Sequence, residues 1–86
     1  MTYSILFTNR SRKQFSKLNK DIQKRIIHYL ESRVCDQPHN FGKSLVGDKK
    51  GLWRYRIDNY RIICNINNNQ LLVLVVDIGH RREIYD

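Results

Sequence analysis

The sequence predicts a small α+β domain, in which one antiparallel sheet of about four strands carries a helical hairpin on one face. With 86 residues and 41% apolar content, the chain suits one domain spanning residues 1–86. Apolar residues recur at helical spacing in the first half, and they alternate with charged residues from Trp53 to Asp58. Together these patterns predict the element order β-α-α-β-β-β.

The first half of the chain is expected to form one strand and both helices. Tyr3–Phe7 is a short strand, and Thr8 or Asn9 can cap the helix that follows, because their side-chain oxygens accept from free N–H groups of a first turn. Arg10–Leu18 is the first helix, and Asp21–Val34 is the second and longer one. The apolar residues of the second helix share one face: Ile22, Ile26, Tyr29, Leu30 and Val34.

A β-hairpin is expected in the stretch Leu52–Ile66, because two strand-like runs flank a turn dipeptide. A loop at Asp58-Asn59 places Arg56 directly opposite Arg61. One face of the hairpin then carries Trp53, Tyr55, Ile57, Tyr60, Ile62 and Cys64. The other face carries Arg54, Arg56 and Arg61.

The last strand is expected over Gln70–Ile78, after a turn at Asn67–Asn69. Its sequence LLVLVVDI lacks polar alternation, which is typical of a strand covered on both faces at the centre of a sheet. Gly79 is expected to end this strand, and the loop Pro38–Gly51 connects the helices to the hairpin. With both helices on one face, the face that carries the arginines is left open to a ligand.

The three hairpin arginines have two interpretations. Like charges directly opposite each other destabilise a sheet, and Arg54 lies about 7 Å along the strand from Arg56. Long side chains that spread into water would make this a solvated face. Alternatively, the repulsion is relieved by phosphate, whose oxygens the planar guanidinium binds two at a time.

The charge balance favours a polyanionic partner. Sixteen Lys and Arg against eight Asp and Glu give a net charge of +8, which indicates nucleic acid first and an anionic membrane surface second. A merely basic soluble protein is the alternative. The helical part contributes cations that either follow a nucleic-acid backbone or form a solvated surface: Arg10, Arg12, Lys13, Lys17, Lys20, Lys24 and Arg25.

Other functional classes receive no support from the sequence. Cys35 and Cys64 have no CxxC spacing and are expected to be reduced thiols of a cytoplasmic protein. No signal peptide is recognisable at the start, and the apolar run Leu71–Val76 is too short to span a bilayer. His28 and His39 fit surface positions, and no His, Cys or carboxylate spacing predicts a metal site or a cofactor.

Over essentially its whole length, the chain resembles the RelE/ParE superfamily of toxins from bacterial type II toxin–antitoxin systems. Its closing Gly-His-Arg followed by Tyr is similar to the RelE-like branch, whose members cut messenger RNA in the ribosomal A site. The ParE branch, which inhibits DNA gyrase, shares the fold and generally lacks this tail. The similar segments are Lys43-Ser44-Leu45, Gly51-Leu52-Trp53-Arg54-Tyr55-Arg56, Tyr60-Arg61-Ile62-Ile63 and Gly79-His80-Arg81-Arg82-Glu83-Ile84-Tyr85.

This resemblance implies a metal-free endoribonuclease that uses the ribose 2′-oxygen to attack the adjacent phosphate. By matching positions, Arg54 and Arg56 are the basic pair of the first hairpin strand, and Arg61 is the arginine of the second. Arg81 matches the arginine after the last strand, and Tyr85 matches the C-terminal tyrosine that orients the nucleotide. Aromatic stacking is a usual way to hold an unpaired RNA base.

The basic pair departs from the family pattern, since several RelE relatives have lysines where this chain has Arg54 and Arg56. Arginine cannot act as a base in a protein, so the pair is expected to be electrostatic. His80 is then the natural candidate for proton transfer, because its unperturbed pKa lies near neutrality. Glu83 is a weaker candidate.

Three functions remain open on the sequence alone: a ribosome-dependent mRNA endonuclease, a gyrase inhibitor without catalysis, and an inactive nucleic-acid-binding relative. The resemblance implies a cognate antitoxin in each case, with an acidic, partly disordered segment that folds on the toxin. It also implies that the ribosome and mRNA are partners, and that operator DNA is bound only through the antitoxin complex. No membrane partner is implied.

Overall fold

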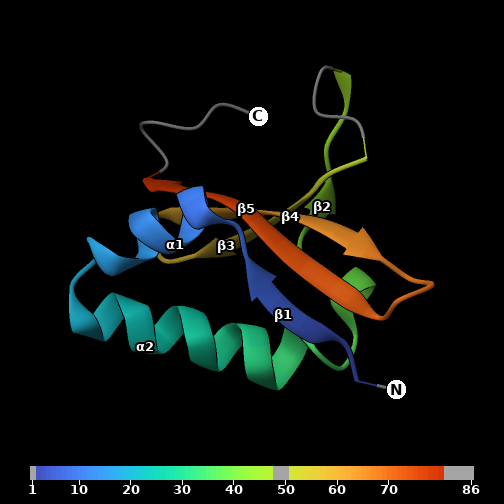
Figure 1. The fold of residues 1–86 in the computed structure, drawn as a ribbon, viewed down its shortest axis with the longest axis horizontal. Helices are drawn as coiled ribbons and strands as arrows, with labels where there is room; N and C mark the ends of the chain where they lie inside the picture. Colours follow the sequence, from blue (N-terminus) through green and yellow to red (C-terminus); the bar gives the residue numbers. More distant parts are fainter. Residues whose placement is uncertain (1, 48–50, 81–86) are drawn as a thin grey trace.

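A twisted five-stranded sheet with two helices packed against it forms the framework (Figure 1). The computed structural model describes residues 2–47 and 51–80. The strands lie in the order β1-β5-β4-β3-β2. Their bounds are Ser4–Phe7 (β1), Lys43–Ser44 (β2), Trp53–Ile57 (β3), Tyr60–Asn67 (β4) and Leu72–His80 (β5). The α+β class with a helical hairpin on the sheet is therefore confirmed.

The sheet differs from the expected one in two respects. β1 runs parallel to β5, with Ser4 paired to Leu72 and Phe7 to Val75, so the sheet is mixed rather than antiparallel. The two-residue strand β2, which pairs antiparallel with β3, adds a fifth strand. Neither pairing could be predicted from a local sequence pattern, because each joins a strand to a segment distant in the sequence. The central place of β5, between β1 and β4, is as expected.

The helices begin where side-chain caps are available. The Thr8 hydroxyl accepts from the Ser11 N–H at 3.1 Å, and α1 follows as Asn9–Ser16. The Asn19 side chain caps α2 (Lys20–Tyr29) in the same way. A π-helical turn, Leu30–Val34, continues α2 to the end of the predicted helix.

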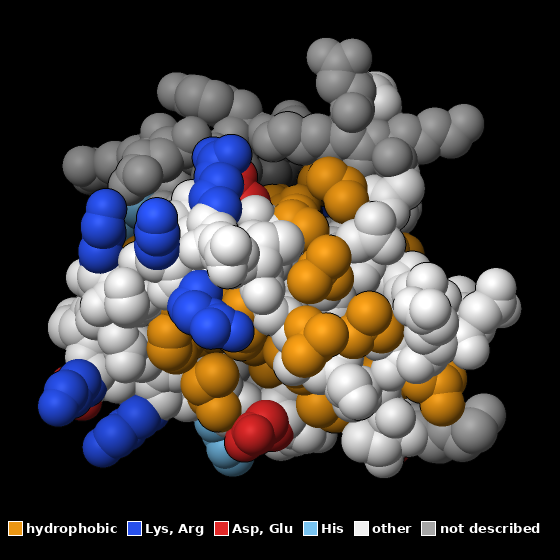
Figure 2. Space-filling model, in the orientation of Figure 1, with side chains coloured by type: hydrophobic (Ala, Val, Ile, Leu, Met, Phe, Trp, Pro, Cys, Tyr) orange, Lys and Arg blue, Asp and Glu red, His pale blue; other side chains and the backbone are white. Residues whose placement is uncertain are grey.

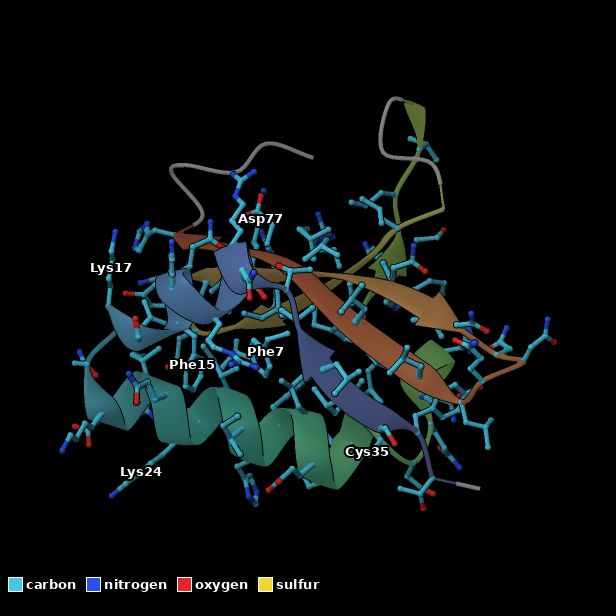
Figure 3. The ribbon with its side chains drawn as sticks, viewed as in Figure 1. Phe7, Phe15, Lys17, Lys24, Cys35 and Asp77 are labelled. Carbon is cyan, nitrogen blue, oxygen red and sulfur yellow. The ribbon has the colours of Figure 1, made fainter. Side chains whose placement is uncertain are left out.

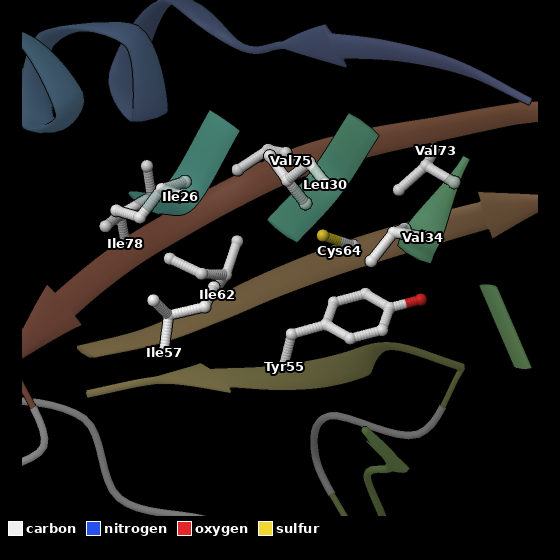
Figure 4. Close-up of a cluster of buried hydrophobic side chains, with 10 residues drawn as sticks. All are labelled: Ile26, Leu30, Val34, Tyr55, Ile57, Ile62, Cys64, Val73, Val75 and Ile78. Atoms are coloured by element: carbon white, nitrogen blue, oxygen red, sulfur yellow. The ribbon is translucent and has the colours of Figure 1, made fainter. Parts of the chain in front are cut away.

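The main core lies between α2 and the sheet (Figure 4). Ile26, Leu30 and Val34 of the helical segment are fully buried against strands β3, β4 and β5. Tyr55 is also fully buried, and its hydroxyl donates to the Pro38 carbonyl at 2.6 Å, which satisfies its polar end. The predicted apolar faces of the second helix and of the hairpin are thus the two sides of one core.

The hairpin has the predicted register. Arg56 pairs with Arg61 across β3 and β4. Asp58 in the turn has a φ of +54°, which aspartate tolerates better than most residues. Its carboxylate accepts from the Arg25 guanidinium of α2 at 2.5 Å, so the turn is tied to the helical layer.

β1 ends at Phe7, and beyond this point side chains of α1 form hydrogen bonds with the backbone at the outer edge of β5. The Ser11 hydroxyl donates to the Val75 carbonyl at 2.7 Å. The Gln14 amide accepts from the Ile78 N–H at 2.8 Å and donates to Asp77 at 2.7 Å. Side chains of a helix thereby satisfy backbone groups that a neighbouring strand would otherwise pair.

β5 continues further than expected. The structure extends it through Gly79, which pairs with Arg61, to His80, which pairs with Tyr60. A register shift lies opposite Ile63 and Cys64, whose partners on β5 are Asp77 and Val75. The expectation that Gly79 ends the strand was wrong, because pairing to β4 holds the glycine in extended backbone.

Candidate anion-binding site

Three arginines meet on the outer face of the sheet, the side that faces away from α2. Arg56 and Arg61 are direct cross-strand partners, and strand alternation puts Arg54 on the same face about 7 Å along β3. Their neighbours Tyr55 and Ile62 point into the core, which fixes the orientation of the arginines. The structure therefore brings together the three hairpin arginines that the sequence predicts.

The arginines influence one another electrostatically. Burial, followed by repulsion from Arg61 and Arg56, lowers the pKa of the Arg54 guanidinium. Arg54 and Arg61 are half-buried and the Nε atom of Arg61 is buried, whereas Arg56 is exposed. All three remain charged because a guanidinium does not lose its proton in proteins. A phosphate that entered this site would be held by several charge-assisted hydrogen bonds and would reduce the mutual repulsion.

Lys43 extends this group, and the sequence did not predict that. It lies on β2 as the cross-strand partner of Arg54, and its side chain is exposed. Its contribution could not be recognised because a two-residue strand gives no alternation to read. We call Lys43, Arg54, Arg56 and Arg61 together the cationic half of the outer face.

The part of the outer face next to these cations is apolar and packed rather than open. Leu45 and Ile63 are buried there, with 8% and 2% of their surface exposed, and Leu52 and Val76 pack against them. The Leu45 N–H donates to the Leu52 carbonyl at 2.9 Å, which holds the two leucines together. The expectation of a wholly open face is corrected by this apolar half, in which residues of the β2–β3 connection cover part of the sheet.

His80 lies apart from the arginines. Its ring contacts the ring of Tyr60, its strand partner, with centroids 5.4 Å apart. Tyr60 is paired with the buried Ile57, so both rings belong to the side of the sheet that carries the helices. There they line a cavity of about 400 Å³ with Lys17 and Leu18, which follow α1. The sheet therefore separates His80 from the cationic half.

Two other predicted site residues, Arg81 and Tyr85, lie outside the described residues, as does Glu83. The aromatic residues of the hairpin have structural roles, as their position in the sequence predicts. Trp53 donates its indole N–H to the Phe41 carbonyl at 2.7 Å, and Tyr60 is half-buried.

The described thiols and acids offer no chemistry of their own at this site. Cys35 and Cys64 are free, and burial raises the pKa of Cys64 to about 12, so its thiol stays protonated. Among residues 2–47 and 51–80, no group of three His, Cys or acidic side chains is placed to hold a metal ion. None of the helices described there is long and apolar enough to cross a membrane.

Comparison with known proteins identifies the family. The model of the ParE toxin of type II toxin–antitoxin systems matches residues 5–85. This chain belongs to the RelE/ParE toxin superfamily. Two curated relatives are toxin RelG of Mycobacterium tuberculosis, 26% identical over 99% of this chain and 98% of its own length, and a RelE-like toxin of Escherichia coli, 30% identical over 94% and 85%.

Solved structures of the superfamily share the fold. The toxin–antitoxin complex RelBE2 of Mycobacterium tuberculosis matches with a TM-score of 0.88 at 23% identity, over 94% of this chain and 93% of that one. A mutant of the Escherichia coli toxin RelE in the free state matches with a TM-score of 0.80 at 20% identity, over 96% and 87%. The chain thus has the fold of these toxins, two helices on a five-stranded mixed sheet.

Proposed function

We propose that this toxin is a ribosome-dependent mRNA endoribonuclease that inhibits translation by cutting in the ribosomal A site. The observation that carries the proposal is the convergence of Arg54, Arg56 and Arg61 on one sheet face. An inhibitor that acts only through protein contacts has no need for three mutually repelling cations. A phosphodiester that gains negative charge during its cleavage does benefit from them.

In the proposed reaction, the 2′-oxygen attacks the adjacent phosphorus and the bond to the 5′-oxygen breaks. The products are a 2′,3′-cyclic phosphate and a free 5′-hydroxyl. Arg61 and Arg56 grip the phosphate oxygens from neighbouring strands, and Arg54 adds charge from the next position on β3. By family resemblance, Arg81 supplies a further positive charge and Tyr85 orients the nucleotide.

The ribosome supplies what this face lacks. The cationic half is the surface of a sheet, against which a strand of mRNA held by the ribosome can lie in a fixed orientation. Holding the reacting groups in line contributes much of the acceleration in such reactions. The net charge of +8 also favours binding to ribosomal RNA.

His80, expected to carry the proton, does not fit this arrangement directly. Its ring packs on Tyr60 on the helix side of the sheet. The proposal therefore rests on electrostatic stabilisation by the arginines, and a separate prediction below tests His80.

Inhibition of DNA gyrase is the second candidate, and the observation in its favour is that the matching family model is that of ParE. The curated relatives with RelE-type names favour the nuclease. An inactive nucleic-acid-binding relative is the third, because arginines stand at positions 54 and 56.

A cognate antitoxin is the proposed protein partner, since several similar structures are complexes of RelE-type toxins with RelB-type antitoxins. Acidic residues of such an antitoxin would cover the cationic half. Its apolar residues would fit a groove of about 230 Å³ between β1 and α2, lined by Ile5, Phe7 and Ile27. Operator DNA would be bound through the antitoxin, and the toxin would act in the cytoplasm.

The deciding experiment is primer extension on an mRNA translated in a purified system, with a gyrase supercoiling assay in parallel. The proposal expects cuts within codons that need both the toxin and ribosomes. Inhibited gyrase without cuts would replace it with the second candidate. No effect in either assay would favour the inactive relative.

A further inference from the structure

The cationic half is longer than one phosphate requires. Arg61 on β4 and Lys43 on β2 lie two strands and two residue positions apart, which corresponds to about 12 Å between their backbones. Arg56 and Arg61 lie close enough to Arg54 that their repulsion, after burial, contributes to the lowered pKa of Arg54. One phosphate can use these three forks, whereas Lys43 stands beyond them at the edge of the sheet.

The apolar half restricts the direction in which a polyanion can extend. The cross-strand partner of Arg54 on β4 is Ile63, which is buried against Leu45. A charged backbone leaving the arginines toward Ile63 would meet packed apolar side chains. Toward β2 it meets Lys43, which is exposed and faces the same side as its partner Arg54.

We propose that Lys43 binds a second phosphate of the RNA strand, adjacent to the phosphate held by Arg54, Arg56 and Arg61. This inference rests on the proposed function, since it takes RNA as the ligand. The side chains suit these two roles. The forked guanidiniums of the arginines bind the phosphate that reacts, and the compact ammonium of Lys43 binds a phosphate that only has to be held. The strand thus runs obliquely across three strands of the sheet, from Arg61 to Lys43.

A binding experiment tests the proposal without cleavage. Short 2′-O-methyl RNA cannot be cleaved, because the attacking 2′-hydroxyl is blocked. A dinucleotide of this kind presents one phosphate, and a trinucleotide presents two. Their affinities are measured by NMR titration of the 86-residue toxin and of Lys43→Gln. We expect Lys43→Gln to bind the dinucleotide like wild type and the trinucleotide about fivefold more weakly. The slope of log affinity against log salt should fall by about 0.7 for the trinucleotide alone.

The matched control is Lys24→Gln, which removes the same charge from an exposed position on α2. It should leave both affinities within twofold of wild type. Equal trinucleotide affinity for wild type and Lys43→Gln would overturn the proposal, as would an equal loss for both ligands, since Lys43 would then share the single phosphate. Failure of the wild type to bind either RNA would also overturn it.

Cleavage on the ribosome separates this inference from the function on which it rests. Replacing one charged oxygen by methyl, at the phosphate on either side of the cut, gives mRNAs that lack a single neighbouring charge. On one of these two mRNAs, we expect wild-type toxin to cleave about fivefold more slowly than on unmodified mRNA. Lys43→Gln should cleave that modified mRNA no more slowly than it cleaves unmodified mRNA, since the interaction is already lost. If, at both phosphate positions, the loss from the modified mRNA and the loss from Lys43→Gln simply add, the second-phosphate site is overturned. If wild type cuts no mRNA at all, the proposed function fails, and the titration alone decides the role of Lys43.

Discussion

The helical layer and the outer face of the sheet both carry positive charge, and they hold it in different ways. Up to Lys43 the chain has nine basic and three acidic residues, and most of these cations are on or near the helices. They are spread along the helix side around an apolar region, and Lys17 and Lys24 point outward at separate places (Figures 2 and 3). The sheet has fewer cations, but its strands fix them side by side.

The neighbours of these cations differ as well. On the helices, Arg25 and Arg10 lie 2.5 and 3.7 Å from the aspartates Asp58 and Asp77. On the sheet, the groups that lower the pKa of Arg54 by charge are two other arginines. Two of the helix cations thus each lie beside an acid, whereas Arg54 lies beside two like charges. Arrangement rather than number therefore distinguishes the cationic half from the cations of the helices.

The largest expected effect is at Arg61 of the cationic half. Arg61→Ala should abolish growth arrest and lower mRNA cleavage at least 100-fold, because a positioned donor to the phosphate is lost. Circular dichroism should show an unchanged fold. By resemblance, Arg81→Ala should do the same. Full toxicity of the double variant would defeat the assignment of both residues.

A large effect on stability is expected at the junction between α1 and β5. Gln14→Leu removes the acceptor for the Ile78 N–H and the donor to Asp77, which should lower the free energy of unfolding by about 1–3 kcal/mol. Urea unfolding measures this. Lys13→Leu, on the exposed side of the same helix, is the control and should change stability by less than about 0.5 kcal/mol. Equal losses would mean that α1 does not depend on its contact with the strand edge.

These first predictions draw on different amounts of sequence information. The hairpin arginines could be placed on one face because the turn at Asp58-Asn59 and strict alternation fix the register. The helix N-caps and the apolar faces could also be predicted, because each depends on residues that lie close together in the sequence. Lys43 could not be placed, since β2 is defined only by its partner β3. The parallel pairing of β1 with β5 is likewise set by tertiary contacts.

The position of His80 shows how one strand boundary changes a proposed role. Ending the last strand at Gly79 leaves His80 in a flexible connection that could reach the arginines. Pairing of Gly79 with Arg61 instead continues the strand, and the alternation then assigns His80 to the side of Tyr60. Glycine is a weak strand former in isolation, so only the structure reveals that its partner strand holds it in place.

A moderate and opposite pair of effects is expected at Arg54. Arg54→Leu removes repulsion from Arg56 and Arg61, so in low salt it should raise the free energy of unfolding by roughly 0.5–1 kcal/mol while reducing cleavage. Added tripolyphosphate should stabilise wild type more than this variant in thermal unfolding. Arg12→Leu, at an exposed position on α1, is the matched control. Destabilisation by Arg54→Leu would contradict this prediction and would mean that other contacts of the Arg54 side chain outweigh the repulsion.

A small effect is expected at His80. His80→Gln should change ribosome-dependent cleavage less than about threefold and leave the shape of the pH–rate profile unaltered, since the ring packs on Tyr60 across the sheet from the arginines. Cleavage rates between pH 5.5 and 8.5 measure this. A loss of 100-fold or more, together with loss of an ionisation near neutrality, would return the proton-carrying role to His80.

The smallest effect is expected from the helical layer. Replacing Lys17, Lys20 and Lys24 together by glutamine removes three charges, as many as the hairpin arginines supply, yet cleavage at physiological ionic strength should change less than about twofold. The reason is that exposed charges interact weakly beyond about 8 Å in such salt, and these lysines lie on the side of the sheet opposite to the cationic half. Primer extension on ribosomes measures this against Arg61→Ala in the same assay. A loss as large as that of Arg61→Ala would mean that total charge governs the activity, and the contrast between the two surfaces would then have no functional meaning.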